Sequence, residues 1–390
     1  MRLNDQKFNR LRILKAIRRA EPVARTDLVT LTGLPRQVVS ELVSSLLERK
    51  LLLEERVAPL GRGRPRMALR INGEAACVLG AFLFPDLQLG VEIVNLRGER
   101  LLHRRTLVGR RPSLHSLALE IARTVDEAIG MTSLERSSIH SVGLGLPAAI
   151  DSLDGILHWL PGYPSEPVPF AAWIADMLGM PVSLDSGANV LTRADHWFGD
   201  DRQVEDFTLV SVGLGIGLGK YEGGLLHVGD HGINSQFAHL KVTPDGGPQC
   251  ACGDHGCLMT YSSVSGILAR ISEMRGEAAP RGDSLQGAFA GAADDASRGD
   301  TIARLAFERA GRVLGTTVAN YINLVDPKRV VIACDERQIV DLIEPTFTAA
   351  LSASTLAVLR GLTEVRFQVT EDISFARGAA ARVLEQLYLG

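Results

Sequence analysis

The sequence predicts an α/β protein that begins with a small, basic, helical head. Three observations lead to this prediction. From about residue 76 onward, short apolar runs that read as buried strands alternate with helical segments, a pattern typical of helix-covered sheets. Residues 1–70 instead contain three short helical segments, with 16 Lys/Arg against 7 Asp/Glu, a surplus of +9. The remaining residues include 26 Lys/Arg against 38 Asp/Glu, a net charge of −12. A basic module joined to an acidic body is typical of a polyanion-binding head.

The totals place the chain among ordinary globular proteins. Its 390 residues favour two or three domains, with 46% hydrophobic and 22% charged residues. No apolar run approaches the roughly 18 residues of a membrane span, and the N-terminus lacks the apolar core of a secretory signal. Five cysteines in such a chain favour a reducing cytoplasm over a disulfide scaffold.

The head contains three predicted helices. The first covers residues 8–19, and the second starts with Thr26 as its N-cap and ends at Gly33. The third runs from about 35 to 49, with Pro35 in its first turn. Two helices joined by a short turn that contains glycine are typical of a helix-turn-helix. The alternative is a plain three-helix packing unit, which the basic surplus disfavours.

The exposed side chains at the start of the third helix are suited to reading DNA. In a helix-turn-helix this part of the second helix enters the major groove. Arg36 and Gln37 can form bidentate hydrogen bonds to guanine and adenine, and Ser40 lies one turn further on the same face. These three residues are therefore predicted to contact an operator in double-stranded DNA.

A wing is predicted after the third helix. Residues 51–57 and 67–71 read as paired strands, and Gly-Arg-Gly-Arg-Pro lies between them at 61–65. This extended, cationic segment suits a narrow, electronegative minor groove, so Arg62 and Arg64 are predicted to contact DNA. The alternative, a solvated linker between domains, stays open, and one segment can serve both purposes.

The body reads as buried strands with covering helices. Predicted strands cover residues 76–84, 90–95, 141–147, 182–185, 207–219 and 329–333, and predicted helices cover about 113–130, 301–325 and 375–387, with another from about 188. Alternate glycines between 213 and 219 leave one face of their strand bare, so that a ligand or another backbone can approach. The stretch 275–300, rich in Gly, Ala and Asp, is predicted to be a mobile surface loop.

Three cysteines within eight residues predict a structural zinc site. Cys250, Cys252 and Cys257 are joined by His239, eleven residues upstream of the first of them. Thiolates and imidazole are the ligands that zinc prefers, and a structural site needs four of them in a tetrahedron. Glycines at 253 and 256 allow the tight turns that would aim three sulfurs at one point. The alternative is a group of small buried thiols, which such close spacing disfavours.

Several motifs in this order resemble the ROK family, named for repressors, open reading frames and kinases. They are the helix-turn-helix head, Gly-Arg-Gly-Arg-Pro, Gly-Leu-Pro at 145–147, Gly-x-Gly-x-Gly at 213–217 and Cys-x-Cys-Gly-x-x-Gly-Cys at 250–257. The resemblance covers nearly the whole chain. It implies a two-lobed, actin-like body of the sugar kinase and ribonuclease H type, with a ligand between the lobes. Repressor members of the family add a winged helix at the front and usually oligomerise.

The sequence departs from the kinase members of the family at three nucleotide-site elements. The Asp-x-Gly-Gly-Thr phosphate loop is replaced by Phe-Leu-Phe-Pro-Asp at 82–86, the second loop reads Gly-Leu-Gly at 213–215, and a late Gly-Gly reads Ala-Cys at 333–334. Phosphoryl transfer depends on positioning and charge stabilisation by backbone amides and metal. Since these segments lack those features, we expect no ATP binding, no kinase activity and no catalytic residues.

The sugar contacts of the family are kept only in part. The resemblance assigns Asp185 to the position of the kinase base, which also binds a sugar hydroxyl, and it assigns Gln236 and His239 to further ligand contacts. Leu184 and Met259 stand where the family has polar contacts, so a more apolar pocket and a modified, deoxygenated or aryl-bearing sugar are expected. Loss of ligand sensing is a second hypothesis, and an N-cap role for Asp185 is an alternative to ligand binding.

The resulting prediction is a cytoplasmic transcriptional repressor of carbohydrate metabolism that binds operator DNA and a sugar-type effector. Residues 1–72 form the winged helix-turn-helix, 73–190 the first lobe with about 372–390 packing back on it, and 191–371 the second lobe with the zinc knuckle. A homodimer or homotetramer and no membrane association are expected. One alternative is an ATP-dependent, hexokinase-like sugar kinase with a DNA-binding head. The other is a regulator whose effector is a partner protein.

Overall fold

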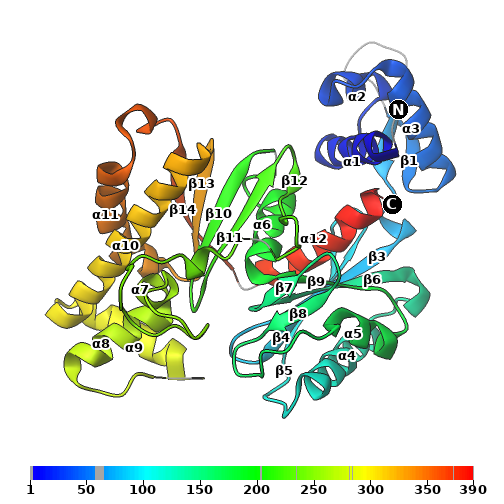
Figure 1. The fold of residues 1–390 in the computed structure, drawn as a ribbon. Helices are drawn as coiled ribbons and strands as arrows, with labels where there is room; N and C mark the ends of the chain where they lie inside the picture. The colour runs from blue at the N-terminus through cyan, green and yellow to red at the C-terminus, as the bar shows by residue number, and fades with distance from the viewer. Residues whose placement is uncertain are drawn as a thin grey trace.

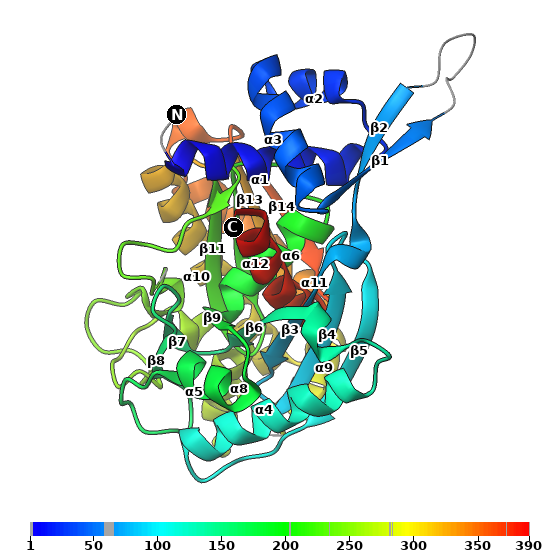
Figure 2. The same ribbon diagram turned by 90° about the vertical axis from the view of Figure 1, so that its right-hand side faces the viewer.

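The chain folds into an N-terminal head and two α/β lobes (Figures 1 and 2). The computed structural model describes residues 3–57, 66–202, 204–233, 235–280, 282, 284–371 and 373–389. Two helices, α6 (Gly187–Phe198) and α12 (Ile373–Leu389), pack against each other between the lobes. The predicted α/β class with a helical head is confirmed.

The head is a three-helix unit with a two-stranded wing. Its elements are α1 (Leu3–Ala20), α2 (Arg25–Thr32), α3 (Arg36–Glu48), β1 (Leu52–Val57) and the antiparallel β2 (Arg66–Ile71). The N-cap of helix α2 is Ala24, two residues before the predicted Thr26, which lies in the first turn of the helix. It ends as predicted at Gly33, whose φ of 64° is the left-handed conformation that favours glycine. Arg62 and Arg64 lie outside the described residues.

The first lobe is built on a five-stranded sheet of order β5-β4-β3-β6-β9. Its strands are β3 (Cys77–Leu83), β4 (Gln88–Asn95), β5 (Arg100–Leu107), β6 (Ile139–Leu146) and β9 (Val182–Ser186), beside a small hairpin of β7 (Ala149–Asp151) and β8 (Ile156–Trp159). Helices α4 (Leu114–Gly130) and α5 (Phe170–Leu178) bury an apolar core against one face. Helix α12 covers the other face, where Gly80 and Gly143 have no room for a Cβ because its backbone lies against them.

The second lobe has its own five-stranded sheet, of order β12-β11-β10-β13-β14. Its strands are β10 (Phe207–Val212), β11 (Ile216–Glu222), β12 (Leu225–Leu226), β13 (Arg329–Cys334) and β14 (Glu364–Val369). Its helices are α7 (Met259–Ser262), α8 (Val264–Arg275), α9 (Ser284–Ser297), α10 (Thr301–Val325) and α11 (Arg337–Ser354). They form a second apolar core with one face of the sheet, while α6 contacts strands β10 and β11.

Two predictions for the second lobe are wrong. The predicted strand 207–219 is the hairpin β10–β11, whose turn contains Gly213 and Gly215. Glycines 217 and 219 are bare because α6 lies against them, and a Cβ there would overlap Ala188 or Thr192. The predicted mobile loop 275–300 contains α9, since Phe289 and three alanines spaced along one helical face are buried in the core.

Helix α1 joins the head to the body. The apolar cluster of the head includes Trp197 of α6 and Tyr388 of α12, and α1 crosses both helices in Figure 2. Arg10 Nε donates to the carbonyl oxygen of Tyr388 at 3.0 Å. A movement of α6 or α12 therefore acts directly on the head. Among the described residues, none of the helices combines the length and the apolar character needed to cross a membrane.

Candidate functional site

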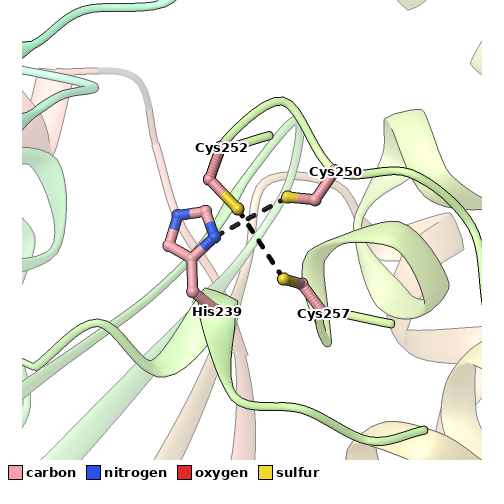
Figure 3. Close-up of side chains that lie close together, drawn as sticks. All are labelled: His239, Cys250, Cys252 and Cys257. Carbon is pink, nitrogen blue, oxygen red and sulfur yellow. Dashed lines mark hydrogen bonds between the residues drawn. The ribbon is translucent and has the colours of Figure 1, made fainter. Parts of the chain in front are cut away.

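The predicted zinc ligands come together in the second lobe. The ligand atoms of His239, Cys250, Cys252 and Cys257, here called the metal group, all lie within 4.8 Å of one another. Figure 3 shows the four side chains pointing toward one point. His239 ends a 3₁₀ turn (Phe237–His239), and the cysteines lie on a tight loop before α7. The loop closes through Cys250 N–H, which donates to the Asp254 carbonyl oxygen at 2.7 Å.

The spacing of the metal group fits a tetrahedral zinc ion. The sulfurs of Cys252 and Cys257 lie 3.8 Å apart, and Nδ1 of His239 lies 3.6 Å from the sulfur of Cys250. Ligand bonds of about 2.3 Å to sulfur and about 2.0 Å to nitrogen give tetrahedral edges of about 3.8 and 3.5 Å. Positive φ angles of 94° at Gly253 and 71° at Gly256 make the turns that the sequence predicted. The group could therefore hold one metal ion, and these two spacings are compatible with zinc.

The surroundings of the metal group also suit a cation with thiolate ligands. Burial raises the pKa of Cys250 to about 12, so a thiolate at this position needs a cation beside it. Burial, assisted by Lys241, lowers the pKa of His239 and keeps its ring neutral, as a metal ligand must be. Lys241 Nζ lies 3.5 Å from the sulfur of Cys257. Three thiolates and one Zn²⁺ carry a net charge of −1, which Lys241 can offset.

His239 presents its second ring nitrogen away from the sulfurs. Since Nδ1 faces Cys250, Nε2 lies on the opposite side of the ring (Figure 3). The ring lies edge to face with Trp159 of β8, at 6.4 Å between centroids, so it contacts the first lobe. Gln236 is exposed and precedes His239 by three residues, and its Nε2 donates to the Ile233 carbonyl oxygen at 3.1 Å. The structure thus places two of the three predicted ligand contacts together.

The third predicted contact, Asp185, is buried away from solvent. Its exposed fraction is 0%. Oδ1 accepts from the backbone N–H of Ser186 at 2.8 Å and from Nδ2 of Asn189 at 2.6 Å, while Oδ2 accepts from Arg193 and Arg382. Burial alone would raise the pKa of Asp185, but the two guanidinium groups outweigh it and hold the pKa below its ordinary value. The N-cap of α6 is Ser186.

Asp185 is connected to the head through buried charges. Arg193 of α6 also donates through Nε to Glu385 of α12, at 3.1 Å. The other oxygen of Glu385 lies 3.8 Å from Nζ of Lys15, which belongs to α1. We call Lys15, Glu385, Arg193, Asp185 and Arg382 the charge network. Its members come from the head, from both central helices and from β9 of the first lobe.

The charge network also reaches the second lobe on the side of the metal group. Arg382 donates through Nη1 to Asp185 at 2.9 Å and through Nη2 to the carbonyl oxygen of Ser152. Ser152 in turn donates its backbone N–H and its hydroxyl to the carbonyl oxygen of Gly232, at 2.9 and 3.0 Å. Gly232 lies in the segment that leads to His239. A continuous set of polar contacts therefore runs from α1 to the approach of the metal group.

Protein side chains fill the two segments that the resemblance assigns to phosphate loops. Phe82, near the end of β3, stacks with Phe375 of α12 at 4.5 Å between ring centroids, and Phe84, just after the strand, meets Phe375 edge to face at 5.7 Å. The backbone N–H of Phe84 is used within the β3–β4 turn, where it donates to Gln88. At the second loop, the carboxylate of Asp335 fills the space beside Gly213, where a Cβ would overlap it.

The two apolar substitutions in the predicted sugar site lie in different surroundings. Leu184 is 0% exposed and belongs to the core between the first sheet and helices α4 and α5. It does not line a pocket, so this part of the expectation is wrong: neighbouring residues on a strand point to opposite faces. Met259 is half-buried, and its methyl group lies near Gly215.

The predicted DNA-contacting residues of the head are accessible. Arg36, Gln37 and Ser40 are exposed on the first turns of α3, while Val39 and Val43 on the opposite face are buried. Gln37 Nε2 donates to Glu41 at 2.9 Å. The arrangement leaves one polar face of α3 free for a groove of DNA.

Sequence reasoning missed four members of the charge network. Lys15, Arg193, Arg382 and Glu385 were not singled out, although the last two stand in an apolar stretch of Ala, Val and Leu near the C-terminus. Charged residues at such buried positions are rare unless paired, which was the available signal. In most pairs the two partners lie about 190 residues or more apart in the chain. The sequence therefore could not predict which charged residues pair with one another.

Comparison with known proteins gives a consistent result. The sequence profile of the ROK family matches residues 90–386. The xylose repressor of Caldicellulosiruptor bescii is 23% identical over 335 residues, which cover 84% of this chain and 83% of the repressor. A crystal structure of a ROK family transcriptional regulator, a homolog of the Escherichia coli Mlc protein, gives a TM-score of 0.79 at 23% identity and covers 99% of this chain and 97% of its own.

An enzyme of known structure shares the body but not the head. A ROK family glucokinase from Streptomyces griseus, in complex with glucose and AMPPNP, gives a TM-score of 0.63 at 21% identity. The match covers 78% of this chain and 98% of the glucokinase. These likenesses establish the two-lobed, actin-like sugar kinase fold of the body.

Proposed function

This chain belongs to the ROK family, and from that premise we propose that it is a DNA-binding transcriptional repressor that responds to a sugar or sugar-derived effector. The observation that carries the proposal is the continuous set of buried polar contacts between α1 of the head and the approach to the metal group. The similarity to a xylose repressor supports both the regulatory role and the effector class. We propose the same domain boundaries as in the sequence analysis: residues 1–72 form the winged helix-turn-helix, 73–190 with about 372–390 form the first lobe, and 191–371 form the second lobe.

The head would bind operator DNA through α3. Arg36 and Gln37 are free to reach base edges in the major groove, and Ser40 lies one turn along. Arg62 and Arg64 are proposed to enter the minor groove beside it. A dimer or tetramer would place two heads on two half-sites, because a helix-turn-helix dimer reads a pseudo-palindrome.

The effector would bind between the lobes beside the metal group. Zinc held by the three cysteines and Nδ1 of His239 would fix the ring and leave Nε2 to contact a sugar hydroxyl, assisted by the exposed amide of Gln236. Zinc here would be structural, since four protein ligands leave no open position for chemistry. Asp185 remains the third proposed contact, and in this conformation its Oδ2 accepts from the two arginines, while its Oδ1 accepts from Ser186 and Asn189.

Two features support a regulator without phosphoryl transfer. The aromatic cluster of Phe82, Phe84 and Phe375 replaces a loop of backbone donors, and phosphoryl transfer needs such donors and a metal. The carboxylate of Asp335 beside Gly213 would repel a triphosphate at the second loop. No catalytic residue is proposed.

The charge network offers a route from effector to head. An effector that drew Asp185 toward the ligand side would compete with Arg193 and Arg382 for its Oδ2. Arg193 would then change its contact with Glu385, which faces Lys15 of α1. An effector shifts such an equilibrium only through different affinities for the two arrangements. The network therefore supplies a physical reason for a sugar to alter the position of the head.

Selection of genomic DNA fragments by the purified full-length protein tests the proposal. We expect enrichment of a pseudo-palindromic sequence near genes for sugar uptake or breakdown. The same preparation is incubated with ATP and a panel of hexoses and pentoses in a coupled assay for ADP. Failure to enrich any sequence, or steady ADP formation that depends on one sugar, would contradict the proposal.

A further inference from the structure

A cavity between the head and the body is lined almost entirely by basic side chains. Its volume is about 180 Å³, and its lining residues are Lys15, Arg18 and Arg19 of α1 with His196, Trp197 and Arg202 of the body. Its lining residues come from α1, from the end of α6 and from the segment that follows α6. The cavity is separate from the metal group and from the exposed face of α3, and of its lining residues only Lys15 also belongs to the charge network.

The floor of the cavity is fixed by hydrogen bonds. Nζ of Lys15 donates to the Gly224 carbonyl oxygen at 2.8 Å and lies 3.2 Å from Nε2 of His196. Nδ1 of His196 faces the Val204 carbonyl oxygen at 3.1 Å, so Nδ1 carries the ring hydrogen and Nε2 accepts from Lys15. Burial and the neighbouring cations lower the pKa of His196 to about 2. The ring is therefore neutral and adds no charge to the cavity.

Among the residues that the structure describes, Arg18, Arg19 and Arg202 of the cavity form no ion pair with a carboxylate within 4.0 Å. Among the described residues, Arg18 donates only to the carbonyl oxygens of Arg97 and Trp197, both at 3.1 Å, and its guanidinium lies 4.8 Å from the Trp197 ring centre. In the same part of the chain, Arg19 and Arg202 are exposed and form no ion pair within 4.0 Å. Burial, with the charges of Arg18 and Arg19 adding to it, lowers the pKa of Lys15 to about 8.

Three carboxylates act on the cations of the cavity but do not balance them. Glu21 acts on Arg18 and is paired with Arg97 at 2.9 Å. Glu385 is 3.8 Å from Lys15 and is shared with Arg193, to which it lies closer, at 3.1 Å. Glu205 is exposed, and it acts on Lys15 and Arg19 only through its field. Four cations therefore face one cavity with less than a full complement of negative charge. Such a concave positive site attracts and concentrates anions.

We propose that this cavity binds a phosphate group, either as inorganic phosphate or as the phosphoryl group of a small monoester. Arg19 and Arg202 at the rim can each donate a bidentate pair of hydrogen bonds, and Lys15 supplies a point charge at the floor. The volume is below the roughly 300 Å³ of pockets that enclose drug-sized ligands. It equals the liquid share of about six waters, which is enough for one tetrahedral oxyanion and part of a substituent.

The bound anion would hold the head against the body. Its ligands on α1 are Lys15, Arg18 and Arg19, and its ligands on the body come from the end of α6 and the segment after it. An oxyanion that contacts both sides relieves the repulsion between Arg19 and Arg202. Burial lowers the pKa of Arg19, and the charge of Arg202 adds to that effect. The proposal concerns ligand binding alone and does not depend on DNA binding or on a sugar effector.

Thermal unfolding of the full-length protein in phosphate tests the proposal. Melting temperatures are measured in chloride buffer of constant ionic strength as inorganic phosphate is added. The variant Arg19→Ala/Arg202→Ala is compared with Arg12→Ala/Arg298→Ala, which removes two exposed arginines elsewhere and changes the net charge equally. We expect phosphate to stabilise the wild type and the control. The cavity variant should need about tenfold more phosphate for the same shift, because charge-assisted hydrogen bonds are lost.

A gain-of-affinity variant and a second ligand sharpen the test. Glu205→Gln removes the nearest free carboxylate and should lower the phosphate concentration needed. Glucose 6-phosphate and glucose are titrated in parallel: a response to the ester that the cavity variant loses identifies a monoester as the ligand. A response to inorganic phosphate alone, lost in the same variant, identifies the free anion. Equal responses of the cavity variant and its control to both phosphates, or no stabilisation of the wild type, would overturn the proposal.

Discussion

Replacement of Asp185 by Asn should destabilise the protein far more than loss of an exposed ion pair. The carboxylate is 0% exposed and accepts from Arg193, from Arg382 at 2.9 Å, and from Asn189 at 2.6 Å. The amide keeps the volume but leaves two buried guanidinium groups without their shared counter-charge. Removal of one partner from a buried ion pair costs about 3–5 kcal/mol of unfolding free energy.

Urea unfolding at pH 7, followed by tryptophan fluorescence, measures this cost. Asp126→Asn serves as the control, because Asp126 pairs with Arg136 at the surface and such pairs contribute about 0–1 kcal/mol. The folded pKa of Asp185 is lowered, so its stabilisation is present above the unfolded pKa of about 3.9 and is lost as pH falls through the folded pKa. The difference between wild type and Asp185→Asn should shrink at strongly acidic pH. A cost at pH 7 no larger than that of the control would refute the reasoning.

Three further predictions concern the metal, the DNA and the dependence of stability on pH. Metal analysis should find about one zinc per chain. Cys252→Ser should lose the metal and melt at a lower temperature, while the control Cys77→Ser should keep the metal. A wild-type protein that contains no zinc would contradict the assignment of the site. Arg36→Ala should weaken binding to the selected operator by about 1–3 kcal/mol in a mobility-shift titration, and unchanged sequence preference would remove Arg36 from the recognition surface. Burial and the neighbouring Asp201 raise the pKa of Asp195 to about 7. The contribution of Asp195 to the free energy of unfolding is therefore present below its unfolded pKa and is lost as pH rises toward and past 7. Unfolding measured from pH 5 to 8 should show this fall in stability, and a fall of equal size in Asp195→Asn would exclude Asp195 as its source.

Local spacing made the metal group and the head readable from the sequence. Cys250, Cys252 and Cys257 lie so close together that any tight loop brings their sulfurs near one another. His239, eleven residues before Cys250, is near enough in the chain to be recognised as the fourth ligand. In the head, Gly33 ends one helix and the pattern of α3 repeats with the helical period. These features depend on neighbours within a few turns of chain, which a sequence displays directly.

The surroundings of Asp185 could not be read in this way. Its partners are eight and 197 residues away, and only the packing of α12 between the lobes brings Arg382 to it. The prediction that Leu184 lines the ligand pocket was wrong for a related reason. Which face of a strand meets the core depends on the packing of the whole sheet, and the sequence of one strand does not show it. The stretch 275–300 shows the opposite error, because its small residues suggested a loop while Phe289 and the alanines of α9 pack into a core.

The affinity of the zinc-loaded protein for its selected operator, measured with and without each sugar of a panel, tests the central claim most directly. One sugar should change the dissociation constant by about fivefold or more, which corresponds to a coupling free energy of about 1 kcal/mol. Glu385→Gln, which weakens the link between Arg193 and Lys15, should still bind operator and sugar separately but reduce that change. An operator affinity that stays constant while the sugar demonstrably binds would contradict the account.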